Sequence, residues 1–118
     1  MNIKFYISFE VAKLLKEKGC DIERDFLTHV YKENGHLYWS SHEDLSNEIP
    51  AYTKDEVVDW LETKGIMIDI HWIGFNENRR WNYSIFSNTC DIIEAKYIYL
   101  TRLEAEEAAI IKVLTEFL

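Results

Sequence analysis

Apolar residues recur at helical spacing in three stretches of the chain. Each stretch follows a residue whose side-chain oxygen can cap a helix, and the first two end at a glycine, which readily takes the left-handed conformation found after helices. The apolar residues of each stretch form one stripe, so we expect helices that bury one side. The predicted helices span residues 9–18, 54–64 and 102–117, after the capping residues Ser8, Thr53 and Thr101.

The stretch from Ile49 to Gly74 predicts a capped helix followed directly by a strand. Thr53 and Glu56 have the spacing of a capping box, in which each side chain bonds the backbone N–H of the other. Apolar residues then alternate along residues 66–73, which is typical of a half-buried strand. The residues expected in the core are Val57, Trp60, Leu61, Ile68, Ile70 and Trp72, and those expected to point outward from the strand are Met67, Asp69, His71 and Ile73.

A second strand is predicted at Arg79–Ser87, with Trp81 opposite Trp72. That register requires an even number of connecting residues, most simply residues 75–78, or else a bulge. Residues 88–99 are harder to interpret. They could form a short edge strand or a covering loop, with apolar residues at Ile92, Ile93, Tyr97 and Tyr99.

An earlier hairpin is predicted from strands Leu27–Lys32 and Leu37–Ser40. Asn34 and Gly35 between them form a dipeptide that favours a two-residue turn, because both residues tolerate positive φ. With these two residues at the turn, the facing pairs are Glu33 with His36, Tyr31 with Tyr38, and Val30 with Trp39.

These elements predict one α+β domain spanning residues 1–118, in the order αββαββα. An antiparallel sheet of about four strands, with helices packed on one face, would bury the apolar sides together. Residues 10–19 and 56–65 match at five of ten positions, which suggests a helix-plus-hairpin repeat, 8–40 and 53–87, closed by helix 102–117.

Composition narrows the possible functions. The net charge of −8 disfavours direct binding of nucleic acid, and no apolar run approaches the roughly 20 residues of a membrane span. The opening MNIKFYISFE lacks the features of a signal peptide, and two distant cysteines do not suggest a disulfide scaffold. We therefore expect a cytoplasmic protein.

Acidic residues concentrate between residues 43 and 62, where seven acids accompany one base, Lys54. Such a run is usually a solvated surface, but it could also be an acidic docking surface, even one that imitates DNA towards a nucleic-acid-binding protein. The candidate partner-binding residues are Glu43, Asp44, Glu48, Asp55, Asp59 and Glu62.

Asp69 and His71 are the candidates for catalysis. They share one face of a predicted strand, and an aspartate that orients a histidine is a recurring part of general-base machinery. Arg80 and Asn82 could lie beside them. The same pattern is also typical of a polar sheet face exposed to water, and no nucleophile motif accompanies it.

No cofactor or metal is predicted. The four glycines all fall at helix ends or turns, which leaves none for a phosphate-binding loop. His29, His36 and the segment His42–Asp44 could supply metal ligands, but their spacing matches no zinc signature.

Four segments together resemble a family of small uncharacterised proteins encoded by phages, prophages and mobile elements of gut Bacteroidetes. They are ISFEVAKLLKEKG, IPAYTKDEVVDWLETKGIMIDI, RWNYSIF and LEAEEAAIIKVL, at residues 7–19, 49–70, 80–86 and 103–114. The resemblance covers most of the chain, apart from residues 91–100, and carries no catalytic residues. It implies an accessory protein without known activity.

Taken together, these features predict a non-enzymatic accessory protein that acts through protein–protein contacts. The alternatives are an acidic mimic of nucleic acid that inhibits a host protein, and a small enzyme that uses the Asp69 and His71 face. Self-association is a further possibility, through an apolar strip formed by Tyr31, Met67, Ile73 and Phe86.

Overall fold

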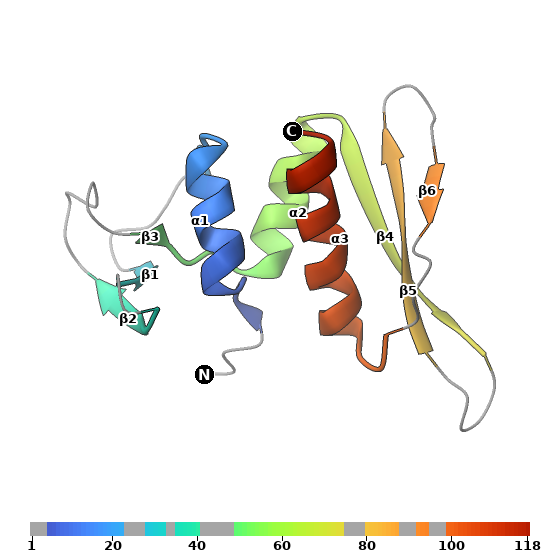
Figure 1. The fold of residues 1–118 in the computed structure, drawn as a ribbon, viewed down its shortest axis with the longest axis horizontal. Helices are drawn as coiled ribbons and strands as arrows, with labels where there is room; N and C mark the ends of the chain where they lie inside the picture. Colours follow the sequence, from blue (N-terminus) through green and yellow to red (C-terminus); the bar gives the residue numbers. More distant parts are fainter. Residues whose placement is uncertain are drawn as a thin grey trace. The chain divides into compact units, whose positions relative to one another are not determined.

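In the computed structural model each of the first two helices is followed by three strands, and a third helix comes last. The structure describes residues 5–22, 28–32, 35–40, 49–74, 80–87, 92–94 and 99–118. These residues belong to two compact units, Met1–Glu56 and Val57–Leu118, and the second helix begins in the first unit and continues into the second. The elements, drawn in Figure 1, are α1 (Phe9–Glu17), β1 (Thr28–Tyr31), β2 (Leu37–Ser40), β3 (Ile49–Pro50), α2 (Lys54–Thr63), β4 (Ile66–Ile73), β5 (Arg80–Ser87), β6 (Ile92–Glu94) and α3 (Arg102–Glu116).

The helix starts confirm the predicted caps. Ser8 and Thr101 each accept a hydrogen bond from the backbone N–H three residues later, at 3.3 and 3.1 Å. Thr53 and Glu56 form both bonds of a capping box: the Glu56 N–H donates to Thr53 Oγ1 at 3.2 Å, and the Thr53 N–H donates to the Glu56 carboxylate at 3.0 Å. Gly65, after α2, has the expected positive φ of 82°.

The sheet of the first unit has the order β2-β1-β3, with antiparallel neighbours. Its central strand is covered on both faces, since His29, Val30 and Tyr31 are all buried. The Tyr31 hydroxyl donates to the Ile7 carbonyl oxygen at 2.6 Å, which fixes the segment before α1 to this strand.

The predicted register of the first hairpin is wrong by one residue. Tyr31 faces Leu37 rather than Tyr38, and Val30 faces Tyr38 rather than Trp39. The Lys32 N–H donates to the His36 carbonyl, so this pair closes a loop of three residues. The predicted pair, Glu33 with His36, would have closed a turn of two. Gly35 has a φ of 82°, as in three-residue hairpin loops that end in a left-handed residue. The additional residue in the loop shifts every pair behind it.

The sheet of the second unit has the order β4-β5-β6, also antiparallel. The predicted pairing of Trp72 with Trp81 is confirmed, and β4 and β5 match without a bulge over eight pairs. The last pair, Ile73 with Arg80, leaves six connecting residues, an even number as predicted. A shorter four-residue connection would involve residues outside those that the structure describes. Residues 92–94 form the short edge strand that was one of two expectations for this segment.

The structure confirms an α+β protein with antiparallel sheets, but not the order αββαββα or one sheet of four strands. Two short strands, β3 and β6, add to the order, and the described strands form two separate sheets. β3 contains the only proline of the chain. Because proline cannot donate to a ladder, such a strand is confined to a sheet edge and is easily taken for a loop.

The two sheets differ in topology, which bears on the predicted repeat. In the first sheet the strand that follows the helix is central, whereas in the second sheet the corresponding strand β4 lies at the edge. The repeat 8–40 and 53–87, like the single domain, stays a prediction.

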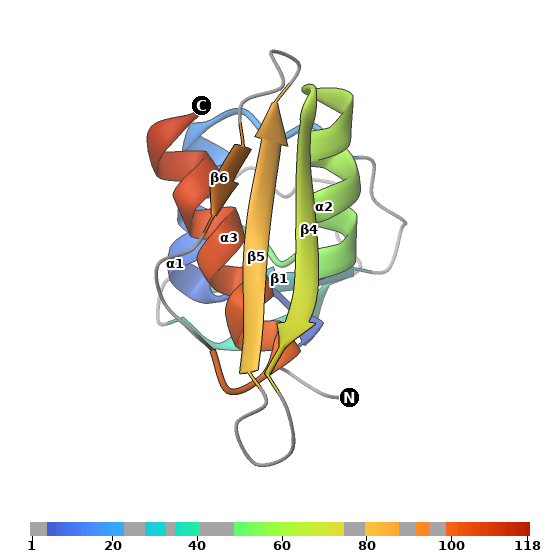
Figure 2. The ribbon, with the colours of Figure 1, turned by 90° about the vertical axis from the view of Figure 1, so that its right-hand side faces the viewer.

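Helix α3 covers one face of the second sheet, behind β4 and β5 in Figure 2. Ile110, Val113 and Leu114 of α3 are fully buried, as are Val57 and Leu61 of α2. Trp72, predicted in the core, is instead 52% exposed, because it lies near the end of an edge strand and has a strand neighbour on one side only. It stacks on Trp81, with ring centroids 5.4 Å apart. No helix in the described part of the chain is long and apolar enough to cross a membrane.

Candidate functional site

The face of the second sheet that points away from α3, here called the outer face, gathers most of the polar candidates. Tyr83 lies on the opposite face, which α3 covers. Lys112 and Glu116 of α3 lie close enough to influence the pKa of Tyr83, which burial and the neighbouring Tyr99 raise. Since side chains alternate along a strand, the next residues on either side of Tyr83 belong to the outer face. Its residues on β4 and β5 are Met67, Asp69, His71, Ile73, Arg80, Asn82, Ser84 and Phe86.

The outer face divides into an apolar end and a polar middle. At the apolar end Met67 faces Phe86, and Met67 is 56% exposed. In the middle Asp69 faces Ser84, and His71 faces Asn82. In Figure 2 this face is turned towards the viewer, with the helices of the unit behind the sheet.

Asp69 and His71 lie together, as predicted. The His71 Nδ1 is 3.5 Å from the Asp69 Oδ2, and the two side chains are 36% and 63% exposed, respectively. The His71 Nδ1 is itself buried and makes no hydrogen bond among the described residues, and 3.5 Å is long for a hydrogen bond, so the carboxylate orients the imidazole weakly. The Asn82 side-chain oxygen accepts from the N–H of Tyr83 at 2.8 Å, so this oxygen is used within its own strand. A catalytic role for the pair stays a prediction.

A surface hollow of about 320 Å³ opens beside the apolar end of the outer face. It forms where the turn after α2 brings the end of the helix next to the start of β4 and the end of β5, and its lining residues are Glu62, Gly65, Met67, Phe86 and Ser87. The hollow therefore combines an exposed thioether, an aromatic ring and a carboxylate. Asp69 and His71 are not among the lining residues.

The sequence identified Glu62 and Met67 separately, one as an acid of the helix and one as an outward strand residue. What it did not predict is that they line one hollow. A tight turn brings the two residues together, and in it the Gly65 N–H donates to the Glu62 carbonyl at 3.0 Å. In the sequence, the glycine directly between helix and strand was the signal for this turn.

The acidic segment is only partly described. Asp55, Asp59 and Glu62 are exposed and lie at intervals of four and three residues, so they occupy one side of α2. Lys54, the base of the segment, is buried. Glu43, Asp44 and Glu48 lie outside the described residues, so the gathering of all six acids stays a prediction.

The remaining candidates differ in their exposure to water. Tyr31 is buried, with its hydroxyl bonded to Ile7, so its predicted place in an exposed apolar strip is wrong; Met67 is exposed, and Ile73 and Phe86 are half-buried. His29 is buried, with Nδ1 3.1 Å from the Tyr6 hydroxyl. Within the described ranges no three side chains are grouped so as to hold a metal ion.

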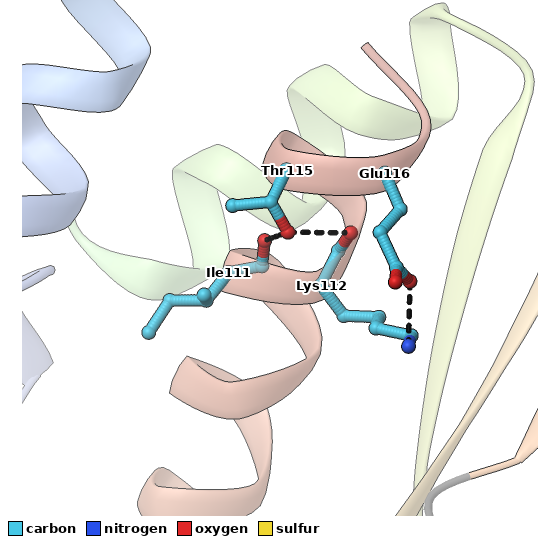
Figure 3. Close-up of polar contacts among 4 residues, drawn as sticks. All are labelled: Ile111, Lys112, Thr115 and Glu116. Atoms are coloured by element: carbon cyan, nitrogen blue, oxygen red, sulfur yellow. Dashed lines mark hydrogen bonds and ion pairs between the residues drawn. The ribbon is translucent and has the colours of Figure 1, made fainter.

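Four residues near the end of α3 offer a contrast in the same unit (Figure 3). The Thr115 hydroxyl donates to the Ile111 carbonyl at 2.8 Å, and the Lys112 ammonium pairs with Glu116, which raises the pKa of Lys112. Ile111 is 39% exposed, but its polar neighbours bond within their own helix. Ile111 is therefore a suitable control position for experiments on the outer face.

No protein-family model, curated protein or solved structure matches this chain. The chemistry of the outer face and its hollow is therefore the basis for a functional proposal.

Proposed function

We propose that this chain is a non-enzymatic accessory protein that binds another protein through the apolar end of the outer face. The observation that carries the proposal is the hollow beside Met67, where an exposed flexible thioether faces Phe86 and the Glu62 side chain also lines the hollow. Methionine adapts its shape to different apolar partners, which suits a binding surface. The proposed setting is the cytoplasm of a gut bacterium that carries the phage or mobile element of the resemblance.

The chemistry of the hollow defines the partner segment. Met67 and Phe86 favour an apolar side chain, and Glu62 favours a lysine or arginine next to it. Asp55 and Asp59 extend the negative charge along α2, and the net charge of −8 would accelerate association with a basic partner. The proposed partner is a protein segment that places an apolar residue beside a basic one.

A peptide-display selection on the immobilised protein tests this proposal. Selected peptides should combine an apolar residue with a lysine or arginine, and their affinity should decrease with salt. Met67→Asp should weaken them about tenfold or more, the effect of removing a central apolar residue from an interface. The matched control Ile111→Asp, which changes an exposed apolar residue on α3, should leave their affinity unchanged.

Two results would contradict the proposal. One is that Met67→Asp and Ile111→Asp weaken the selected peptides equally. The other is that the selection enriches acidic peptides, since these would be repelled by Glu62 and by the acids of α2.

An acidic mimic of nucleic acid is the second candidate, supported by the common side that Asp55, Asp59 and Glu62 share on α2. The test is binding to a panel of DNA- and RNA-binding proteins, with and without competing DNA. The triple substitution Asp55→Asn, Asp59→Asn and Glu62→Gln should abolish binding if the acids replace phosphates. Glu10→Gln with Glu17→Gln on α1, which removes two negative charges elsewhere, is the control, and equal loss in both variants would contradict mimicry.

An enzyme that uses Asp69 and His71 is the candidate from another class, supported by their 3.5 Å approach. Any activity found with the purified protein should disappear in His71→Gln and persist in Ile111→Asp. Activity that survives in His71→Gln would exclude this pair as its origin.

A further inference from the structure

The strand β4 is a long edge strand that carries few of the features that prevent strands from pairing with other chains. It is eight residues long, pairs with β5 without a bulge, and has no other strand partner among the described residues. Proteins usually protect such edges with lysine, proline, bulges or short strands. Residues 66–73 contain no lysine and no proline. The opposite edge of the sheet, β6, has only three residues.

Exposed apolar side chains concentrate on the same strand. Met67 and Trp72 are 56% and 52% exposed, and they are the large apolar residues left exposed on the strands whose side chains the structure describes. Met67 lies on the outer face near one end of β4, and Trp72 lies on the opposite face near the other end. A strand added along β4 would therefore cover one apolar residue at each end.

The sequence of β4 is complementary to itself in one antiparallel register. A two-fold axis normal to the sheet keeps the outer face of both copies on the same side, so only outer-face residues can oppose outer-face residues. When Ile70 of each copy meets at the axis, Asp69 faces His71 of the second copy. In the same register Met67 faces the second copy's Ile73, and Ile68 faces its Trp72.

The neighbouring registers lack this complementarity. Centring the pair on Asp69 would place two carboxylates directly opposite each other, which is destabilising. Centring it on His71 would place two imidazoles opposite each other and Asp69 opposite Ile73. The register centred on Ile70 places the Asp69 carboxylate opposite an imidazole and apolar residues opposite apolar residues.

We propose that two copies of this chain pair antiparallel through their β4 strands, in the register centred on Ile70, to form one continuous six-stranded sheet. Such an isologous contact closes on itself, so it yields a dimer and not a fibre. It goes beyond the proposed partner binding, because it uses the edge of β4 and does not require the hollow.

Disulfide cross-linking tests the register in a Cys20→Ser, Cys90→Ser background. Ile70→Cys should form a covalent dimer under mild oxidation, because residues directly opposite each other lie within the range that a disulfide spans. The matched control Ile68→Cys should not, because its counterpart in the second copy is Trp72. The combination of Ile68→Cys with Trp72→Cys should cross-link again.

Sedimentation analysis of the full chain tests the charge complementarity. Asp69→Lys should weaken the dimer about three- to tenfold, since it places a lysine on the edge and removes two favourable cross-strand pairs. Asp69→Lys combined with His71→Asp should restore association. Met67 and Glu62 stay unchanged in both variants, so a change in association does not come from the loss of either of these residues of the hollow.

A monomer at high protein concentration would overturn the proposal. So would a dimer in which Ile68→Cys cross-links as readily as Ile70→Cys, because the register would then differ. Urea unfolding of each variant distinguishes lost association from lost folding.

Discussion

The two sheets of this protein are both antiparallel and three-stranded, but they differ in which side chains are exposed to water. In the first sheet three consecutive residues of the central strand, His29, Val30 and Tyr31, are buried, so both faces of that strand are covered. In the second sheet the central strand β5 likewise has three consecutive buried residues, 83–85, but the edge strand β4 alternates and exposes Met67 on the outer face. The two central strands are therefore alike, and the second sheet differs in its long edge strand, which leaves side chains of the outer face exposed.

The polar groups of the two units also differ. In the first unit the Tyr31 hydroxyl and the His29 ring are bonded internally, to Ile7 and Tyr6. In the second unit the Asp69 carboxylate is largely exposed, and the His71 Nδ1 beside it makes no hydrogen bond to another described residue. The following substitutions measure how far the two sheets differ in stability.

The largest difference in unfolding free energy is expected between substitutions on the two faces of the second sheet. Ile85, on the central strand β5, is 1% exposed, so Ile85→Ala should lower the free energy of unfolding by about 2–5 kcal/mol through lost burial and a cavity. Met67→Ala, on the outer face, should lower it by less than about 0.5 kcal/mol. Urea unfolding followed by circular dichroism measures both. Equal losses would mean that the outer face is covered by something in the folded chain.

The sequence predicted the second sheet better than the first, for a physical reason. A face exposed to water leaves a period of two in the sequence, and this period correctly paired Trp72 with Trp81. A strand covered on both faces has no such period, so the register of the first hairpin depended on its turn alone. Asn34 and Gly35 fit a two-residue turn, but the chain closes a three-residue loop between Lys32 and His36.

The candidate site was predicted as separate parts. Alternation along β4 placed Asp69 and His71 on one face, and helical spacing placed Asp59 and Glu62 on one side of α2. The hollow between helix and strand depends on the geometry of the turn at Gly65, which spacing along the chain does not encode. Burial of Tyr31 also escaped prediction, because its hydroxyl finds a partner 24 residues away in the chain.

Removal of a tyrosine hydroxyl should have the next largest effect on the unfolding free energy. Tyr31→Phe removes a buried hydrogen bond to the Ile7 carbonyl and should cost about 1–2 kcal/mol of unfolding free energy. Tyr83→Phe in the second unit should cost less, since its hydroxyl has no hydrogen bond to another described residue. Both are measured by urea unfolding, with segment-resolved hydrogen exchange to assign the loss to one unit. A larger loss for Tyr83→Phe would reverse the comparison.

Removal of a helix cap should lower the unfolding free energy by a similar amount in both units. Ser8 and Thr101 make the same type of bond at similar lengths, 3.3 and 3.1 Å, so Ser8→Ala and Thr101→Ala should each cost about 1 kcal/mol. The conservative variants Ser8→Thr and Thr101→Ser should retain most of the stability. If one cap costs several times more than the other in urea unfolding, the units differ in their helices as well as in their sheets.

The smallest effect concerns pH, because protonation changes one charge and removes no side chain. Burial lowers the pKa of His29, so the unfolded chain binds its proton more readily than the folded chain. Stability from this residue is therefore fully present above the ordinary histidine pKa of about 6.5 and decreases as the pH falls below it. The difference in unfolding free energy between pH 7.5 and pH 5.5 should shrink in His29→Asn. If the difference is the same in His29→Asn as in the unchanged chain, the burial of His29 does not determine the pH dependence of stability.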